Sequence, residues 1–216
     1  PFGSVVIAAD KTLSADGNGT ALAAVVSGAG ALAKVGGGTL VLSATNSHAG
    51  GTVASGGTLQ VSADGQLGDA AAAVMLQNGA RLAWNAGSTA QSTSRAVVLG
   101  TGGGTLDITG TLAVTGALSG IGALTKAGAG TLSLAPAAAD GNSGFDGSVT
   151  LAGGTLALDQ PQALRSANAV MLSSTAASTL HVNTDTTLGA LSGGATGATP
   201  FGSVVIAADK TLSADG

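Results

Sequence analysis

The chain has 216 residues, with 37 glycines and neither cysteine nor glutamate, and its net charge is −4. The negative charge and the lack of a basic cluster argue against a nucleic-acid partner. Abundant glycine and few charged residues disfavour helices, whereas Thr, Val and Leu between Gly-rich turns favour strands. Hydrophobic residues make up 44%, too many for a disordered polar chain. No apolar run approaches the ~20 residues of a membrane-spanning helix.

The first seventeen residues recur unchanged at the other end of the chain. Residues 1–17 and 200–216 have the same sequence, at an offset of 199 residues. Such a run indicates a tandem array, in which residues 1–199 are one full period and residues 200–216 begin the next. Because the sequence starts at Pro1 without methionine, we interpret it as a segment cut from a longer polypeptide, so that the lack of a signal peptide in it is not evidence against export.

The period contains a second, more diverged repeat. Residues 27–42 align without gaps with residues 119–134, at an offset of 92 residues. We therefore expect two modules in each period, at about residues 1–92 and 93–199.

A shorter rhythm is set by Thr-Leu pairs. A series of them stands at Thr12, Thr39, Thr58, Thr105, Thr131, Thr155, Thr179 and Thr211, with Arg81-Leu82 in the gap between Thr58 and Thr105. The successive steps of 27, 19, 23, 24, 26, 24, 24 and 32 residues are typical of solenoid coils. Apolar and small polar residues alternate around each pair, as in a short strand with one buried face. The sequence thus predicts an all-β, single-stranded parallel β-helix of roughly eight to ten coils, continuous over residues 1–216 and on the order of 40–50 Å long.

Both modules resemble the passenger-associated repeat of bacterial autotransporters. The string Leu-x-Lys-x-Gly-x-Gly-Thr-Leu-x-Leu runs from Leu32 to Leu42 and again from Leu124 to Leu134, and each copy is followed by an Asn and a further Gly-Thr-Leu strand. The structural repeat positions that carry the resemblance are Gly38, Thr39, Leu40, Leu42, Gly57, Thr58, Leu59, Gly130, Thr131, Leu132, Leu134, Gly154, Thr155 and Leu156. The resemblance implies a right-handed parallel β-helix exported to the bacterial cell surface, often in adhesins and self-associating proteins. Where the family commonly has Tyr, this chain has His48 and Phe145.

Residues capable of catalysis are sparse. His48 aligns with Phe145 and is expected to fill a packing position, and His181 lies in a strand. Neither histidine has a nucleophile and a carboxylate at a recognisable spacing. We therefore expect no catalytic site.

Scattered charges and one tryptophan provide the alternative of a polysaccharide-acting β-helix enzyme. Such an enzyme needs clustered carboxylates, or Asp with Arg or Lys, on one face. The candidates are Asp64, Asp69, Arg81, Arg95 and Asp107, which we expect to be scattered over turns as solubilising charges. Trp84 could stack on a sugar, but a packing role is the more frequent one for a lone Trp in a strand.

The segment from Asp140 to Gly147 is a weak calcium candidate. Asp140, Asn142 and Asp146 alternate with glycine, as hard-oxygen ligands would. The chain has no Glu to complete such a loop, and the matching segment of the first module has no Asp. We expect a turn-rich loop there, with no metal and no cofactor. Residues 18–20 form a glycosylation sequon, which is common by chance.

Together these patterns predict a structural or adhesive segment of a secreted bacterial cell-surface protein. Its partners would be the adjacent repeats of the same chain, like molecules in a filament or aggregate, and a host or surface glycan. The lack of cysteine fits an extracellular location. A passive stalk that carries an adhesive tip elsewhere is a further alternative.

Overall fold

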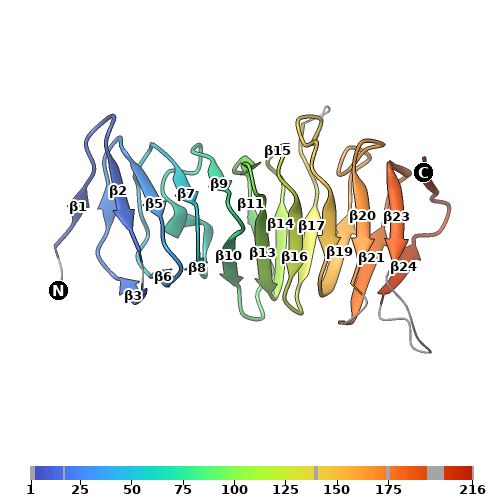
Figure 1. The fold of residues 1–216 in the computed structure, drawn as a ribbon, viewed down its shortest axis with the longest axis horizontal. Helices are drawn as coiled ribbons and strands as arrows, with labels where there is room; N and C mark the ends of the chain where they lie inside the picture. Colours follow the sequence, from blue (N-terminus) through green and yellow to red (C-terminus); the bar gives the residue numbers. More distant parts are fainter. Residues whose placement is uncertain (1–2, 17, 139–140, 174–175, 194–201, 216) are drawn as a thin grey trace.

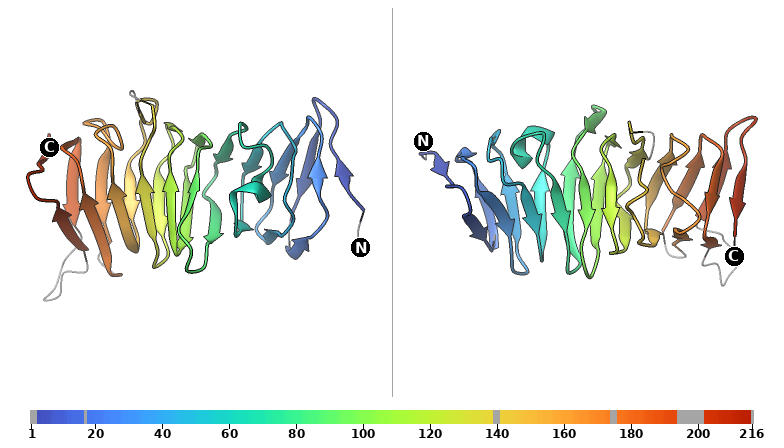
Figure 2. Two further views of the ribbon diagram at one scale, coloured as in Figure 1. Left: turned by 180° about the vertical axis from the view of Figure 1, so that it is seen from behind. Right: turned by 90° about the horizontal axis from the view of Figure 1, so that it is seen from above.

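The structure is a computed structural model, and it describes residues 3–16, 18–138, 141–173, 176–193 and 202–215. The strands stack side by side along one long axis and form a parallel β-solenoid of about nine coils (Figures 1 and 2). The predicted all-β parallel solenoid is thereby confirmed. The helical element of the described residues is one short 3-10 helix, η1 (Asp64–Leu67). Within the described part of the chain, no helix is both long and apolar enough to cross a membrane.

The longest sheet, called here the nine-stranded sheet, runs along the whole solenoid. Its strands are β3 (Asn18–Leu22), β6 (Thr39–Leu42), β8 (Thr58–Val61), β10 (Ala80–Asn85), β13 (Gly104–Thr109), β16 (Leu124–Ala127), β18 (Val149–Leu151), β20 (Ala169–Leu172) and β23 (Ala190–Gly193).

Two six-stranded sheets form the remaining faces. The β11 sheet contains β11 (Gln91–Thr93), β14 (Thr111–Val114), β17 (Thr131–Leu134), β19 (Gly154–Leu158), β21 (Ser178–Val182) and β24 (Gly202–Ile206). The β2 sheet contains β2 (Thr12–Ala15), β5 (Ala31–Lys34), β7 (Thr52–Ala54), β9 (Val74–Leu76), β12 (Val97–Leu99) and β15 (Leu118–Gly120). Near the ends, β1 (Val5–Val6) pairs with β4 (Val26–Ser27), and β22 (Thr186–Leu188) pairs with β25 (Leu212–Ala214).

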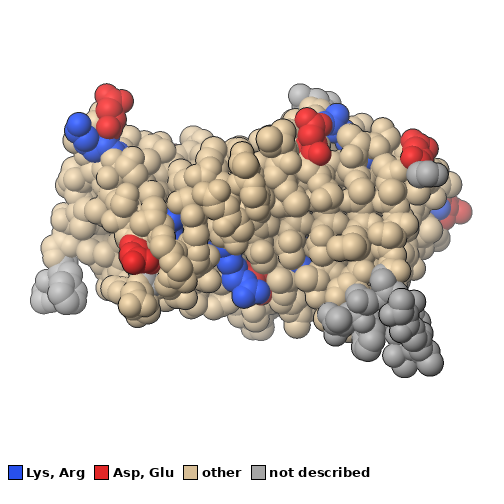
Figure 3. Space-filling view, viewed as in Figure 1, with Lys and Arg blue, Asp and Glu red and all other residues tan. Residues whose placement is uncertain are grey.

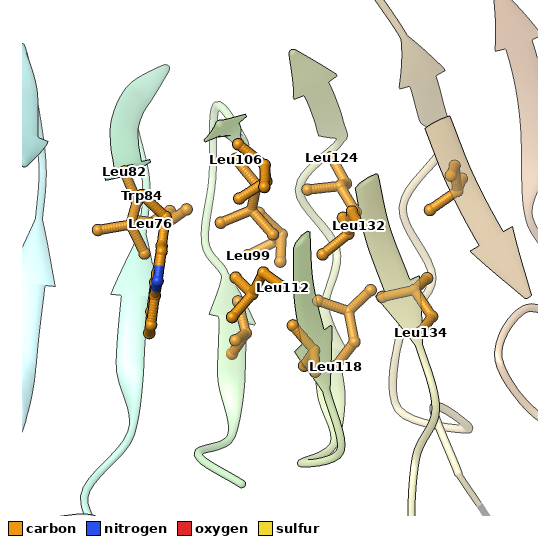
Figure 4. Packing of buried hydrophobic residues seen from close by; sticks show 14 of the residues in the cluster. Leu76, Leu82, Trp84, Leu99, Leu106, Leu112, Leu118, Leu124, Leu132 and Leu134 are labelled. Atoms are coloured by element: carbon orange, nitrogen blue, oxygen red, sulfur yellow. The ribbon is translucent and has the colours of Figure 1, made fainter. Parts of the chain in front are cut away.

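The core consists of leucine columns that point into the solenoid. In the nine-stranded sheet, Leu40, Leu59, Leu82 and Leu106 stack in register, and in the β11 sheet Leu112, Leu132, Leu156 and Leu180 do the same. All eight are at most 2% exposed. Figure 4 shows leucines from neighbouring strands meeting in the interior. Each buried leucine contributes about 1.5–3 kcal/mol of transfer free energy, and no coil has a core of its own.

The Thr-Leu column changes face along the chain. Thr12 is in the β2 sheet, whereas Thr39, Thr58 and Thr105 are in the nine-stranded sheet and Thr131, Thr155 and Thr179 are in the β11 sheet. Leu212 then begins β25. The three longest steps, of 27, 26 and 32 residues, are the three changes of face. Each change of face adds about a third of a coil to the step between two Thr-Leu pairs. The rhythm had suggested one Thr-Leu pair per coil, and the structure shows that this does not hold at the changes of face.

The two modules consequently lie on different faces. The lysine-containing strand is β5 in the β2 sheet in the first module, but β16 in the nine-stranded sheet in the second. The following Gly-Thr-Leu strand is β6 in the first and β17 in the second. The second module is therefore turned by one face around the solenoid axis relative to the first.

Candidate functional site

A fully buried lysine closes a corner of the coil in each module. The Nζ of Lys126 donates to the carbonyl oxygens of Ala127, Gly128 and Gly153 at 2.7, 3.0 and 3.1 Å. Gly128 has a φ of 76°, which lets the chain turn so that its carbonyl faces the ammonium group. Because all three donors of the ammonium group have partners, Lys126 fastens the corner to the next coil.

Lys34 repeats this arrangement in the first module. Its Nζ donates to the carbonyl oxygens of Val35, Gly36 (2.8 Å) and Gly56 (3.2 Å). Burial lowers the pKa of Lys34, and the nearby carboxylate of Asp16 opposes this shift. The sequence pattern marked these lysines as repeat positions but not as buried corner residues.

The pKa of Lys126 is lowered more clearly, to about 8, by burial. The charge of Asp107 acts in the opposite direction. The group therefore stays mainly protonated at neutral pH, the state in which it donates three hydrogen bonds.

A buried asparagine in each module joins three consecutive coils. Asn46 accepts from the backbone N–H of Val26 (2.8 Å) and donates to the carbonyl of Gln66 (2.6 Å). Asn142 accepts from the backbone N–H of Leu118 at 2.6 Å and donates to the carbonyl of Ala163 at 2.8 Å. The amide thus satisfies backbone groups where the coil leaves regular strand pairing.

The same contacts bear on the calcium candidate. The amide oxygen of Asn142 already accepts a backbone hydrogen bond, and the carboxylate of Asp146 pairs with Arg165. Asp140 lies outside the described residues. Over the described ranges, no three or more His, Cys, Asp or Glu side chains gather as a metal site would require.

Arg95 organises the loop that contains η1. It is 2% exposed, and its Nε lies 2.8 Å from Oδ1 of Asp64. The guanidinium also donates to the backbone carbonyls of Asp64, Leu67, Gly68, Asp69 and Ala72. The expectation that Asp64, Asp69 and Arg95 are scattered is therefore wrong, because the buried arginine draws this loop around itself. The N–H groups of Arg95 donate hydrogen bonds to this loop, so the role of Arg95 is structural.

Arg81 and Asp107 form a second ion pair, on adjacent strands of the nine-stranded sheet. The Nε of Arg81 lies 3.3 Å from Oδ2 of Asp107, and both side chains are partly exposed. These residues are on β10 and β13 and not in turns, which corrects the expectation for them. On the face seen in Figure 3, charged side chains lie singly or in small pairs of opposite sign on a largely uncharged surface.

The two histidines lie in different environments. His48 is fully buried, and its Nε2 lies 2.9 Å from the hydroxyl of Thr52. That hydroxyl donates to the carbonyl of Leu67, so the Nε2 of His48 acts as the donor to it. Burial lowers the pKa of His48. His181 is half-buried on β21, opposite Ala157 and Val205.

Trp84 is part of the core. It is 1% exposed, and its Nε1 donates to the Oε1 of Gln91 at 3.2 Å, while Gln91 in turn donates to the carbonyl of Ser62. A void of about 10 Å³ lies beside the indole, near the lower limit for one water molecule. The indole is therefore a packing residue and is not available to stack on a sugar.

Two surface grooves flank the loop between β19 and β20. One, of about 250 Å³, is lined by residues 136–138 and 160–162. The other, of about 390 Å³, is lined by Pro161, Gln162, Leu164, Arg165, Ser166, Asp185, Thr187 and Asp215. Asp185 accepts from the backbone N–H and hydroxyl of Thr211, which lowers the pKa of its carboxyl. These linings offer hydrogen bonds to a polar ligand.

The comparison with known families agrees with this geometry. Residues 32–61 and 124–158 match the family model of the passenger-associated-transport-repeat, and these ranges contain both lysine corners. No curated protein and no solved structure matches the chain. The two segments match the repeat model of this family, and the parallel solenoid supports an autotransporter passenger β-helix repeat.

Proposed function

We propose that this chain, with its two passenger-associated transport repeats, is a structural and adhesive segment of a secreted bacterial cell-surface protein. It provides rigid reach and presents weak contacts many times, to like molecules or to a surface glycan. Residues 1–199 serve as one period of the array, and residues 200–216 begin the next.

The observation that carries this proposal is the continuity of the solenoid. The nine-stranded sheet passes through both modules without a break, and the buried hydrophobic cluster extends from Leu32 to Leu188. The conspicuous buried polar residues, Lys34, Lys126 and Arg95, bind backbone carbonyls of neighbouring coils. The length of such a chain is set by the number of stacked coils, and similar surfaces recur along it at fixed intervals.

The test compares arrays of one, two and three periods that are immobilised at equal density. A multivalent segment should retain cells or glycan-coated beads with an avidity that rises steeply with the number of periods. A passive stalk should change the height of the array and leave retention unchanged, and that outcome would reject the adhesive part of the proposal. A three-period array with Leu132→Asp in every period is the control for binding by misfolded protein.

A further inference from the structure

Between β5 and β15, the outer side of the β2 sheet carries no charged side chain. Leu32, Lys34 and Leu99 point into the solenoid and are fully buried, so the residues that alternate with them point outward. The strands pair in register along the axis (Figure 1). At the middle of β7, β9, β12 and β15, the outward residues are Val53, Met75, Val98 and Ser119. This outer side of β5 to β15 is called here the lateral face.

Two further columns of residues border the middle of the lateral face. Backbone hydrogen bonds and strand register align the members of each column from coil to coil. The entry column, at the start of each strand, consists of Ala31, Gly51, Ala73, Ala96 and Ala117. The exit column, at the end of each strand, consists of Val35, Ser55, Gln77, Gly100 and Ile121. The entry column is therefore low throughout, whereas the exit column includes the larger side chains.

Ile121 is the most exposed of the large side chains on this face, at 73%. It stands on a corner between Gly120 and Gly122, where an added Cβ would lie 2.1 Å from the carbonyl oxygen of Leu99 and 2.0 Å from that of Gly100. These close approaches fix the corner, so the chain presents the isoleucine rigidly to solvent. The equivalent residue of the first module is Ala29, so the corner itself does not require a large side chain.

The lateral face is complementary to itself under one symmetry. A twofold axis parallel to the solenoid axis would set two lateral faces against each other, coil opposite the same coil, with each entry column against the partner's exit column. Ala117 would then lie opposite the partner's Ile121, and Ala73 opposite the partner's Gln77, so that small residues meet large ones. A twofold axis along the strands would instead set the entry column against its own copy, and a gap between small side chains forfeits packing.

Opposite charges flank β2 in the same sheet. Lys11 precedes the strand on its entry side and Asp16 follows it on its exit side, and both are exposed. The axis parallel to the solenoid brings each Lys11 toward the partner's Asp16, which makes two attractive contacts at the rim. No charge is buried between the faces, whereas the nine-stranded sheet has Arg81 and Asp107 on its outer side. Charge and shape thus both favour a second copy in parallel orientation.

We propose that the lateral face binds the same face of a second copy of this chain, with the two solenoids parallel. This inference rests on the self-association part of the proposed function and names its surface. Val53, Met75 and Val98, which are half-buried in the single chain, form the centre of the interface. Because the same patch serves on both molecules, the contact closes on itself and yields a pair of side-by-side rods.

The test measures dimers of the whole chain by sedimentation velocity over a range of concentrations. Met75→Lys places an unpaired charge at the centre of the interface and should raise the dissociation constant roughly tenfold or more. Met171→Lys is the matched control, because Met171 stands in the same Ala-Val-Met-Leu sequence but points outward from β20 in the nine-stranded sheet. It should leave the dissociation constant unchanged, and circular dichroism verifies that both variants fold.

Cysteine cross-linking determines the orientation, since the chain has no cysteine of its own. In parallel dimers Val98→Cys faces its own copy, so mild oxidation should give a disulfide-linked dimer on non-reducing gels. Met171→Cys should stay monomeric under the same conditions. If Val98→Cys is linked only in a mixture with Val53→Cys, the molecules are antiparallel and the parallel arrangement is rejected.

The remaining outcomes separate this interface from the proposed function. A chain that is monomeric at all concentrations, or a dimer that Met75→Lys leaves intact, overturns the proposal. Retention of glycan-coated beads in the array experiment by a chain that never dimerises would reject this interface and leave the adhesive function standing. Dimers that Met75→Lys dissociates, without retention by any array, would support the interface and reject the adhesive function.

Discussion

At the scale of single residues, the buried lysines illustrate how a cation can be kept in an apolar solenoid. Lys126 has no carboxylate in direct contact and is held by three backbone carbonyls. Lys126→Met would leave these carbonyls unpaired, and we expect the free energy of unfolding to fall by about 1–3 kcal/mol. The loss stays in this range because the variant also avoids the burial of a charge. Urea denaturation measures it, with the exposed Lys11→Met as the control that should change little.

His48 should make the solenoid sensitive to mild acid. Its pKa in the folded chain is lowered from 6.5 by burial, so as the pH falls below 6.5 the unfolded chain takes up the proton first. The free energy of unfolding should therefore decrease as the pH falls from 7.5 to 5. His48→Phe, which introduces the residue found at Phe145 in the second module, should flatten this dependence. His181→Gln should keep it, and an unchanged slope in His48→Phe would contradict the role of His48.

At the scale of elements, the loop around η1 depends on one side chain. Arg95→Met would remove the partner of Asp64 and leave several backbone carbonyls of residues 64–72 unpaired. Because a broken buried ion pair costs about 3–5 kcal/mol, we expect a marked loss of stability and early cleavage within this loop. Limited proteolysis with subtilisin and mass spectrometry locates the cleavage. Arg81→Met is the matched control, since its partly exposed pair with Asp107 should contribute about 0–1 kcal/mol.

The strands themselves could be predicted because their pattern is local. Gly-Thr-Leu-x-Leu places Leu40 and Leu42 on one side of β6, and both are buried, while Thr39 is only half-buried. Strand pairing in register then follows from stacking like on like, as with Thr39 opposite Thr58.

The faces and the corner contacts could not be predicted in the same way. Whether a strand belongs to the β2 sheet or to the nine-stranded sheet depends on the summed length of all preceding turns, so β5 and β16 differ in sheet despite their similar sequences. Arg95 meets Asp64 across 31 residues of chain, and no short spacing reveals that contact. A lysine at the same position of two apolar strands was the available signal for the buried corners.

At the scale of the whole molecule, the offset of 199 residues between the two identical segments corresponds to a whole number of coils. The Thr-Leu column moves from the β2 sheet through the nine-stranded and β11 sheets, and the third change of face ends at β25, the counterpart of β2. The eight steps between successive Thr-Leu pairs would span eight coils at one coil each. The three changes of face, each of about a third of a coil, add one more coil, which gives about nine. An offset of 199 residues therefore returns the chain to its starting face, whereas an offset of 92 residues does not. In the array that we propose, any loop of one period would then recur on the same side of the rod in the next.

The two copies of the seventeen-residue segment allow this phase and length to be measured within one chain. Lys11 and Lys210 are equivalent, exposed positions, and the chain has no cysteine, so Lys11→Cys with Lys210→Cys accepts exactly two spin labels. A straight solenoid of about nine coils should place the labels roughly 43 Å apart, with a narrow distribution in a double electron–electron resonance experiment. Lys11→Cys with Ile121→Cys, about halfway along the chain, should give about half that distance. A broad or much shorter distance for the first pair would show that the coils bend or slip and would reject an array of rigid periods in phase.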